Sequence, residues 1–220
     1  MITAAIFDMD GLLFDSEPLW QEAEYQVFSR LGVKVTPELS AITAAMTTKE
    51  VTEFWYQQHP WQGDSLVSVE QAVIDQVELL IKQKGEAKPG VKKILNFCKE
   101  QGLKIALATN SPYQLIPVIL DALEVRHYFD VITSSEQVEK GKPAPDVYLK
   151  TAQRLNVEPK QCMVFEDSPS GLAAGVAADM KVIVVPQKEN YDNPKFELSR
   201  FKLASLFDFS KHHFEVLTAA

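Results

Sequence analysis

Short runs of apolar residues recur along the chain, and within them polar and apolar positions do not alternate. They lie at residues 4–7, 104–108, 131–133, 162–165 and 182–185. Runs of this length and character are typical of strands that are covered on both faces. We therefore predict five buried strands.

Segments with apolar residues at helical spacing separate these strands. They cover residues 91–101, a stretch after Ser111–Pro112, a stretch after Asp146 and the small-residue run 171–178. We expect Gly102 to end the first helix, and Ser111 and Pro112 to be the N-cap and first residue of the second. Alternation of strands and helices predicts an α/β fold with a Rossmann-like, doubly wound parallel sheet.

One long stretch, residues 15–85, breaks this alternation because its pattern is helical throughout. Ser16 and Pro18 are suited to begin a helix that Gly32 would end. Thr47 and Glu50 have the spacing of a capping box, as do Ser68 and Gln71. The stretch therefore predicts a small all-helical cap domain, inserted after the first strand.

The predicted boundaries follow from that insertion. Residues 1–14 and 86–220 would form the α/β core, and residues 15–85 the cap. The chain would cross between them at residues 14–17, the expected hinge, and again at 86–89. A block inserted there would lie above the carboxyl ends of the strands, where open α/β sheets bind ligands.

Composition narrows the class of protein. The 220 residues are 46% hydrophobic and carry a formal net charge of −8, which disfavours general binding to nucleic acid or to anionic membranes. The first apolar run is too short for a signal peptide or a membrane span, so we expect a cytoplasmic protein. Cys98 and Cys162 lack metal-ligand spacing, and we expect two reduced thiols.

Two acids, Asp8 and Asp10, follow the first predicted strand, and Gly11 permits a sharp turn after them. One carboxylate can attack phosphorus while a second transfers a proton. Acids at such a position are equally common as turn formers or N-caps, so this pair alone leaves both interpretations open.

Two further motifs could bind an anion. Thr109, Asn110 and Ser111 follow the second strand, where a hydroxyl and backbone N–H groups at a helix start can hold a phosphate; a plain Ser111 N-cap is the alternative. Lys142 lies in a proline-rich loop that could fix its charge on a phosphate. Taken alone, a solvent-exposed lysine is the simpler interpretation.

Adjacent acids, Glu166 and Asp167, end the fourth predicted strand. Neighbouring carboxylates repel each other unless a cation lies between them, and Mg²⁺ prefers such oxygen ligands. An acidic N-cap for the helix at Pro169 is the alternative. All four motifs end strands that would reach one edge of a parallel sheet, and this co-occurrence favours a single site.

These residues, in this order, resemble the haloacid dehalogenase-like hydrolase superfamily. The resemblance extends from residue 2 to about residue 186. It implies that Asp8 is the nucleophile and Asp10 the general acid–base. It implies that the phosphoryl group is bound by Thr109, the backbone N–H of Asn110 and Lys142. It also implies that Mg²⁺ is held by Asp8, the backbone carbonyl of Asp10 and Asp167, with Glu166 as a direct or water-mediated ligand.

Within the superfamily, residues 7–20 resemble 2-deoxyglucose-6-phosphate and hexitol phosphatases, and next the β-phosphoglucomutases. This implies a Mg²⁺-dependent phosphatase of small sugar or polyol phosphates that forms an aspartyl-phosphate. A β-phosphoglucomutase-type phosphotransferase is the alternative. Relatives often carry a Gly-x-Arg pattern in the cap, but the corresponding residues 45–49 contain no arginine, and only Lys49 could substitute.

Other readings fit less well. A dehalogenase needs neither a metal nor an acid at position 10, and a silent binding module would not need every catalytic group. No P-loop kinase motif occurs.

Trp20 and Glu24 could line the cap side of the site, whereas Trp55 and Trp61 are expected to pack in the interior of the cap. We expect a monomer, with the tail from residue 187 packed on the core.

Overall fold

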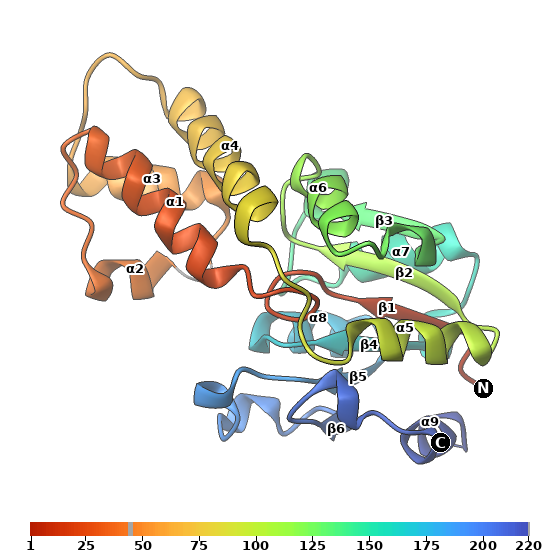
Figure 1. Ribbon diagram of the computed structural model, residues 1–220. Coiled ribbons are helices and arrows are strands. Elements are labelled where there is room, and N and C mark those ends of the chain that lie inside the picture. Colours follow the sequence, from red (N-terminus) through yellow and green to blue (C-terminus); the bar gives the residue numbers. More distant parts are fainter. Residues whose placement is uncertain (44–45, 220) are drawn as a thin grey trace.

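The computed structural model describes residues 1–43 and 46–219, and in it a parallel sheet forms the centre of the molecule (Figure 1). The strand order is β3-β2-β1-β4-β5-β6. The strands are β1 (Ala4–Phe7), β2 (Lys104–Thr109), β3 (Val131–Ser134), β4 (Cys162–Glu166), β5 (Lys181–Val184) and β6 (Phe201–Lys202). The five predicted strands and the α/β class are confirmed. Sequence patterning missed β6 because two residues show no periodicity.

Seven α-helices of the described chain correspond to predicted ones, whereas α2 and α9 were not predicted. They are α1 (Glu17–Arg30), α2 (Pro37–Thr43), α3 (Thr48–Gln58), α4 (Leu66–Lys84), α5 (Val91–Glu100), α6 (Leu115–Ala122), α7 (Asp146–Leu155), α8 (Pro169–Ala177) and α9 (Lys211–Ala219). Helices cover both faces of the sheet: α5 packs against β2 on one face, and α7 and α8 pack on the other. This is the doubly wound arrangement.

Register brings the functional ends of the strands together. Phe7, the last residue of β1, pairs with Leu107 of β2 and with Phe165 of β4. Parallel pairing places the loops after these strands at one edge of the sheet. Phe7 also stacks on Phe165 with ring centroids 4.8 Å apart, which fixes the two strand ends side by side.

Two predicted helix starts were wrong. Helix α6 begins at Leu115 rather than at Pro112, because the Ser111 side chain is used elsewhere. Helix α4 begins at Leu66, where the Ser65 hydroxyl accepts from Ser68 N at 3.1 Å, one turn before the predicted box at Ser68. By contrast, the box at Thr47 is confirmed, since Thr47 and Glu50 cap each other reciprocally.

Helices α1 to α4 form one block between β1 and α5. In Figure 1 this block lies beyond the end of β1, reached by two chain crossings. Helix α4 packs against α1 and α3, and an aromatic cluster of Phe28, Trp55 and Trp61 fills the block. At the crossing, Lys88 N donates to Leu13 O at 2.9 Å. We keep the name cap for residues 15–85, whose exact boundaries stay a prediction.

The tail after β5 packs on the core, as expected, through Phe196, Leu203 and Leu206, which are buried. Leu198 and Phe207, which also belong to this tail, are exposed. Cys98 and Cys162 are buried and free of disulfides. Among the described helices, none is both long and apolar enough to cross a membrane.

Candidate active site

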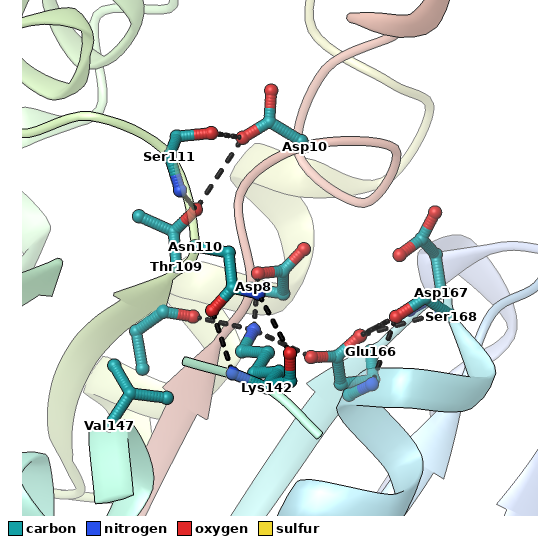
Figure 2. Close-up of polar contacts among 12 residues, drawn as sticks. Asp8, Asp10, Thr109, Asn110, Ser111, Lys142, Val147, Glu166, Asp167 and Ser168 are labelled. Atoms are coloured by element: carbon teal, nitrogen blue, oxygen red, sulfur yellow. Dashed lines mark hydrogen bonds and ion pairs between the residues drawn. The ribbon is translucent and has the colours of Figure 1, made fainter. Parts of the chain in front are cut away.

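A buried ammonium group holds the centre of the site together. Lys142 Nζ lies 2.5 Å from Asp8 Oδ1 and 2.7 Å from Glu166 Oε1, and donates to Ala108 O at 2.8 Å (Figure 2). The ends of β1, β2 and β4 each supply one of these acceptors. The exposed-lysine interpretation of Lys142 was therefore wrong.

Charge balance keeps this lysine protonated. Burial lowers the pKa of Lys142, but the carboxylates of Asp8 and Glu166 raise it more, and the net shift is upward. A buried cation with two carboxylate partners satisfies the requirement that buried charges be paired. The phenol of Tyr148 completes the cluster by donating to Glu166 Oε1 at 2.5 Å.

The second carboxylate oxygen of Asp8, Oδ2, has no hydrogen-bond partner among the described residues. Asp8 lines a cavity at the edge of the sheet. Burial, opposed by Lys142 and assisted by Glu166 and Asp10, raises the pKa of Asp8 to about 7. A further positive charge near Oδ2 would favour the ionised form.

The donor set supports a cation beside Asp8. Carboxylate oxygens of Asp8, Glu166 and Asp167 all lie within 4.8 Å of one another. Burial, together with Asp8 and Glu166, raises the pKa of Asp167 well above its ordinary value. Its carboxylate accepts no hydrogen bond from any described residue. Asp8 and Asp167 therefore fit a hard cation such as Mg²⁺, which takes carboxylate oxygens.

Glu166 has other partners. Its Oε1 accepts from Lys142 and Tyr148, while Oε2 accepts from Asp167 N at 3.1 Å and Ser168 Oγ at 3.2 Å. A Cβ on Gly171 would come within 1.8 Å of this carboxylate, so only glycine allows the helix α8 to approach so closely. The contacts indicate that Glu166 positions Lys142, and its direct or water-mediated role at the metal stays a prediction.

The Asp10 carboxylate faces the same cavity from the loop after β1. Its Oδ2 accepts from the Ser111 hydroxyl and, at 3.5 Å, from the Thr109 hydroxyl. Its Oδ1 accepts from Trp20 Nε1 at 3.4 Å. A carboxyl group held at both oxygens and open to a cavity is suited to proton transfer.

The Asn110 side chain has a structural role, while the role of its backbone N–H in phosphate binding stays a prediction. Its Oδ1 accepts from Lys142 N at 2.9 Å and its Nδ2 donates to Lys142 O at 3.1 Å. This pair of bonds fixes the lysine loop beside β2. A Cβ on Gly141 would lie 2.8 Å from Asn110 Oδ1, so the glycine before Lys142 permits the approach.

Sequence reasoning missed two roles. Ser111 was expected to cap a helix, but it contacts Asp10; its place in the Thr109 motif was the available signal. Tyr148 lies in the helix predicted after Asp146, and its hydroxyl is bonded to Glu166. Nothing in the sequence near Tyr148 indicates that partner.

The cavity above these residues has a volume of about 730 Å³. Its floor includes Asp8, Asp10, Thr109, Lys142 and Asp167, so the structure brings together the core residues predicted for the site. Its other wall comes from the cap. Trp20 and Glu24 line it, as predicted, whereas Trp55 and Trp61 are buried in the aromatic cluster.

The structure describes most of residues 45–49, the segment that corresponds to the Gly-x-Arg pattern of relatives. Ala45 lies outside the described residues, while Met46, Thr47 and Thr48 line the cavity. Lys49 does not line it; its ammonium is mostly exposed and lies 3.9 Å from Glu53. Lys49 therefore does not substitute for an arginine at this wall.

Comparisons with known proteins agree with this geometry. A family model described as haloacid dehalogenase-like hydrolase matches residues 2–179. Hexitol phosphatase B of Escherichia coli K12 is 42% identical over 207 residues, covering 93% of each chain. A phosphorylated carbohydrates phosphatase of Thermotoga maritima is 36% identical, covering 82% of this chain and 83% of its own.

Similarity extends to solved structures. The crystal structure of a putative beta-phosphoglucomutase from Thermotoga maritima superposes with a TM-score of 0.78 at 31% identity, and the match covers 100% of both chains.

Proposed function

The chain belongs to the haloacid dehalogenase-like hydrolase family, and from that premise we propose that it is a Mg²⁺-dependent phosphatase. Its substrates would be monophosphates of small sugars or polyols, resembling 2-deoxyglucose 6-phosphate or a hexitol phosphate. The reaction would pass through an aspartyl-phosphate on Asp8.

One observation carries this proposal: the Lys142 ammonium binds Asp8 and Glu166 at the floor of a cavity that Asp10 and Asp167 also line. A nucleophile, an acid–base and positive charge are thereby close together. Phosphoryl transfer depends mainly on such positioning and on charge stabilisation.

In the first step, Asp8 Oδ2 attacks phosphorus, forming an O–P bond as the ester P–O bond breaks. Asp10 gives its proton to the departing alkoxide, which leaves as a neutral alcohol. Lys142, the Thr109 hydroxyl and the Asn110 N–H would stabilise charge on the phosphoryl oxygens. The product of this step is the phosphorylated Asp8.

In the second step, Asp10 accepts a proton from water as the water oxygen attacks phosphorus. The bond between phosphorus and Asp8 breaks, inorganic phosphate leaves, and Asp8 returns to its carboxylate form. Asp10 ends this step protonated, ready for the next cycle. Ser111 and Trp20 hold the Asp10 carboxyl in place through both steps.

Asp8, Asp167 and the backbone carbonyl of Asp10 would hold Mg²⁺. When bound, the ion would neutralise charge on the phosphoryl group and keep Asp8 ionised despite its burial. Glu166, whose oxygens already accept from Lys142, Tyr148 and the loop of Asp167, would orient these residues.

The substrate class rests on the named relatives, two of which are phosphatases of hexitols or phosphorylated carbohydrates. A cavity of about 730 Å³ has room for a six-carbon monophosphate. We also propose that the protein acts as a cytoplasmic monomer and has no nucleic-acid or membrane partner. Size-exclusion chromatography with light scattering tests whether the protein is a monomer in solution.

The test is a panel of phosphorylated sugars and polyols, assayed for inorganic phosphate with Mg²⁺. We expect release from hexose or hexitol monophosphates, and none from the Asp8→Asn variant or in EDTA. Full activity of Asp8→Asn, or activity insensitive to EDTA, would contradict the proposal.

Similarity to a putative beta-phosphoglucomutase favours one alternative, a phosphotransferase that returns the phosphate to the sugar. Formation of glucose 6-phosphate from β-glucose 1-phosphate distinguishes the two activities. The phosphatase proposal predicts inorganic phosphate as the product and no net isomerisation.

A further inference from the structure

Both walls of the active-site cavity carry carboxylates, but the two walls differ in the cations that accompany them. Among the described residues, its lining cations, Lys142 and Lys195, both come from the core. The cap contributes the carboxylates of Glu17 and Glu24 and no lining cation, since Lys49 lies outside the cavity. The part of a substrate that faces the cap therefore meets negative charge.

The rest of the cap wall is polar and uncharged. Hydroxyl groups line it at Ser40, Thr43, Thr47 and Thr48. Hydroxyl groups of this kind can exchange hydrogen bonds with a polyhydroxyl chain. None of them offers the positive charge that a second phosphate group requires.

The two cap carboxylates differ in what they already bind. Glu17 accepts hydrogen bonds from Gln21 at 3.2 Å and from Gln187 at 3.1 Å. Glu24 is partly buried, but it accepts no hydrogen bond of good geometry from any described residue. Trp55 Nε1, which is fully buried, also makes no hydrogen bond of good geometry. Apart from its interaction with the Trp55 indole, Glu24 therefore has acceptor capacity in the cavity lining that no described side chain uses.

The partly buried surroundings of Glu24 change the pKa of its carboxyl group. Burial raises the pKa of Glu24 to about 7, and the Trp55 indole opposes this shift to a smaller degree. Buried polar groups in folded proteins are rarely left without a partner. Hydroxyl groups of a bound substrate would supply one, because they can donate to a carboxylate and accept from a carboxylic acid.

From this geometry we propose that Glu24 is a specificity-determining residue: it binds hydroxyl groups of the substrate body and excludes substrates with a second phosphate. This inference rests on the proposed phosphatase function and adds the class of body that the site accepts. A neutral polyhydroxyl body satisfies Glu24, whereas a second phosphate places like charges together across a partly desolvated wall.

The test compares three substrates with the wild type and two variants. Sorbitol 6-phosphate has a neutral hydroxyl-bearing body, fructose 1,6-bisphosphate carries a second phosphate, and p-nitrophenyl phosphate has no hydroxyl groups. Glu24→Gln removes the charge and keeps the shape. Glu22→Gln is the matched control on the same helix, since Glu22 is bonded to Lys84 at 2.7 Å and does not line the cavity.

For Glu24→Gln we expect the ratio of kcat/KM between the monophosphate and the bisphosphate to fall about tenfold or more, because a like-charge contact is removed. The change should lie in KM, with kcat for sorbitol 6-phosphate within about twofold of wild type. Activity of Glu24→Gln on p-nitrophenyl phosphate should change less than its activity on sorbitol 6-phosphate, because p-nitrophenyl phosphate has no hydroxyl groups for Glu24 to bind. Glu22→Gln should match wild type on all three substrates.

Two results would overturn the inference: a wild type that hydrolyses the bisphosphate as efficiently as the monophosphate, or a kcat/KM ratio that is unchanged in Glu24→Gln.

If the wild type releases phosphate from none of the three substrates, that result would instead contradict the proposed function. Calorimetric binding then tests Glu24 separately, because binding needs no turnover. About tenfold weaker binding of sorbitol 6-phosphate to Glu24→Ala would support the inference, and equal binding would refute it.

Discussion

The indole Nε1 of Trp20 donates a hydrogen bond to Asp10 Oδ1 across 3.4 Å. Trp20 belongs to α1 in the cap, and Asp10 to the loop that leaves β1 in the core. The other oxygen of Asp10 accepts from Ser111 on the core side. The proposed acid–base is thus held from both walls of the cavity, which couples its orientation to the position of the cap.

Trp20→Phe tests this coupling, since it removes the N–H and keeps an aromatic ring. Loss of one hydrogen bond to a carboxylate should lower kcat by about two- to tenfold and change KM little. Trp61→Phe is the matched control, because Trp61 Nε1 donates to Asp64 O at 3.2 Å, away from the site. Equal kcat values for the two variants would contradict a role of Trp20 at Asp10.

Lys142→Met tests the ion-pair centre of the site. The substitution leaves Asp8 and Glu166 buried and facing each other without a cation. Breaking a buried pair by removing one partner destabilises a protein by about 3–5 kcal/mol. Urea denaturation at neutral pH should show a loss of this size. Lys140→Met, two residues away and exposed, should unfold like the wild type.

Asp167→Asn tests the cation site. The Mg²⁺ concentration for half-maximal activity should rise about tenfold or more when a carboxylate of the site becomes an amide. Without metal, the same variant should be more stable than wild type, because burial and neighbouring carboxylates already disfavour an ionised Asp167. Asp179→Asn, at an exposed position, should change neither quantity. Wild-type Mg²⁺ dependence in Asp167→Asn would exclude the ligand role.

Glu24→Gln should also change how stability depends on pH. Burial raises the pKa of Glu24 from 4.5 to about 7, so the folded protein keeps this proton more readily than the unfolded chain. The wild type therefore loses stability as pH rises from about 4.5 through 7, by up to about 3 kcal/mol at 1.36 kcal/mol per pKa unit.

The amide of Glu24→Gln cannot ionise and escapes this loss. Thermal denaturation should find the variant more stable than wild type at pH 8 and equal to it near pH 4, where the wild-type carboxyl is protonated. The other charged groups of the cavity are the same in both proteins, so their contributions cancel. A constant difference between the two proteins across this range would show that Glu24 keeps an ordinary pKa.

The fold and the core of the site could be predicted because both depend on strand ends. Apolar runs located the strands, and polar residues directly after a strand must lie at the edge of a parallel sheet. This is why Asp8, Thr109 and Glu166 were predicted together. Lys142 lies in a loop, and its burial could not be predicted from composition, because it depends on two carboxylates that distant strands supply.

The remaining errors have local physical causes. Ser111 has the sequence context of an N-cap, but a tertiary contact with Asp10 uses its hydroxyl, and the helix starts four residues later. Ser65 and Ser68 are both capping residues by type, and helix α4 begins at the earlier one. Helical periodicity predicts that Trp20 and Glu24 lie on the same face of α1. Which residues that face contacts depends on how the cap packs on the core, and the sequence pattern does not contain this information.

The central claim is that Asp8 itself carries the phosphoryl group, and trapping that group tests it most directly. Enzyme mixed with sorbitol 6-phosphate and Mg²⁺, quenched in acid within milliseconds and digested, should yield a phosphorylated peptide that contains Asp8. Phosphate at that residue, lost with time and missing from Asp8→Asn, is the expected result. Turnover with no phosphorylated peptide, or with the phosphate on another residue, would contradict the account.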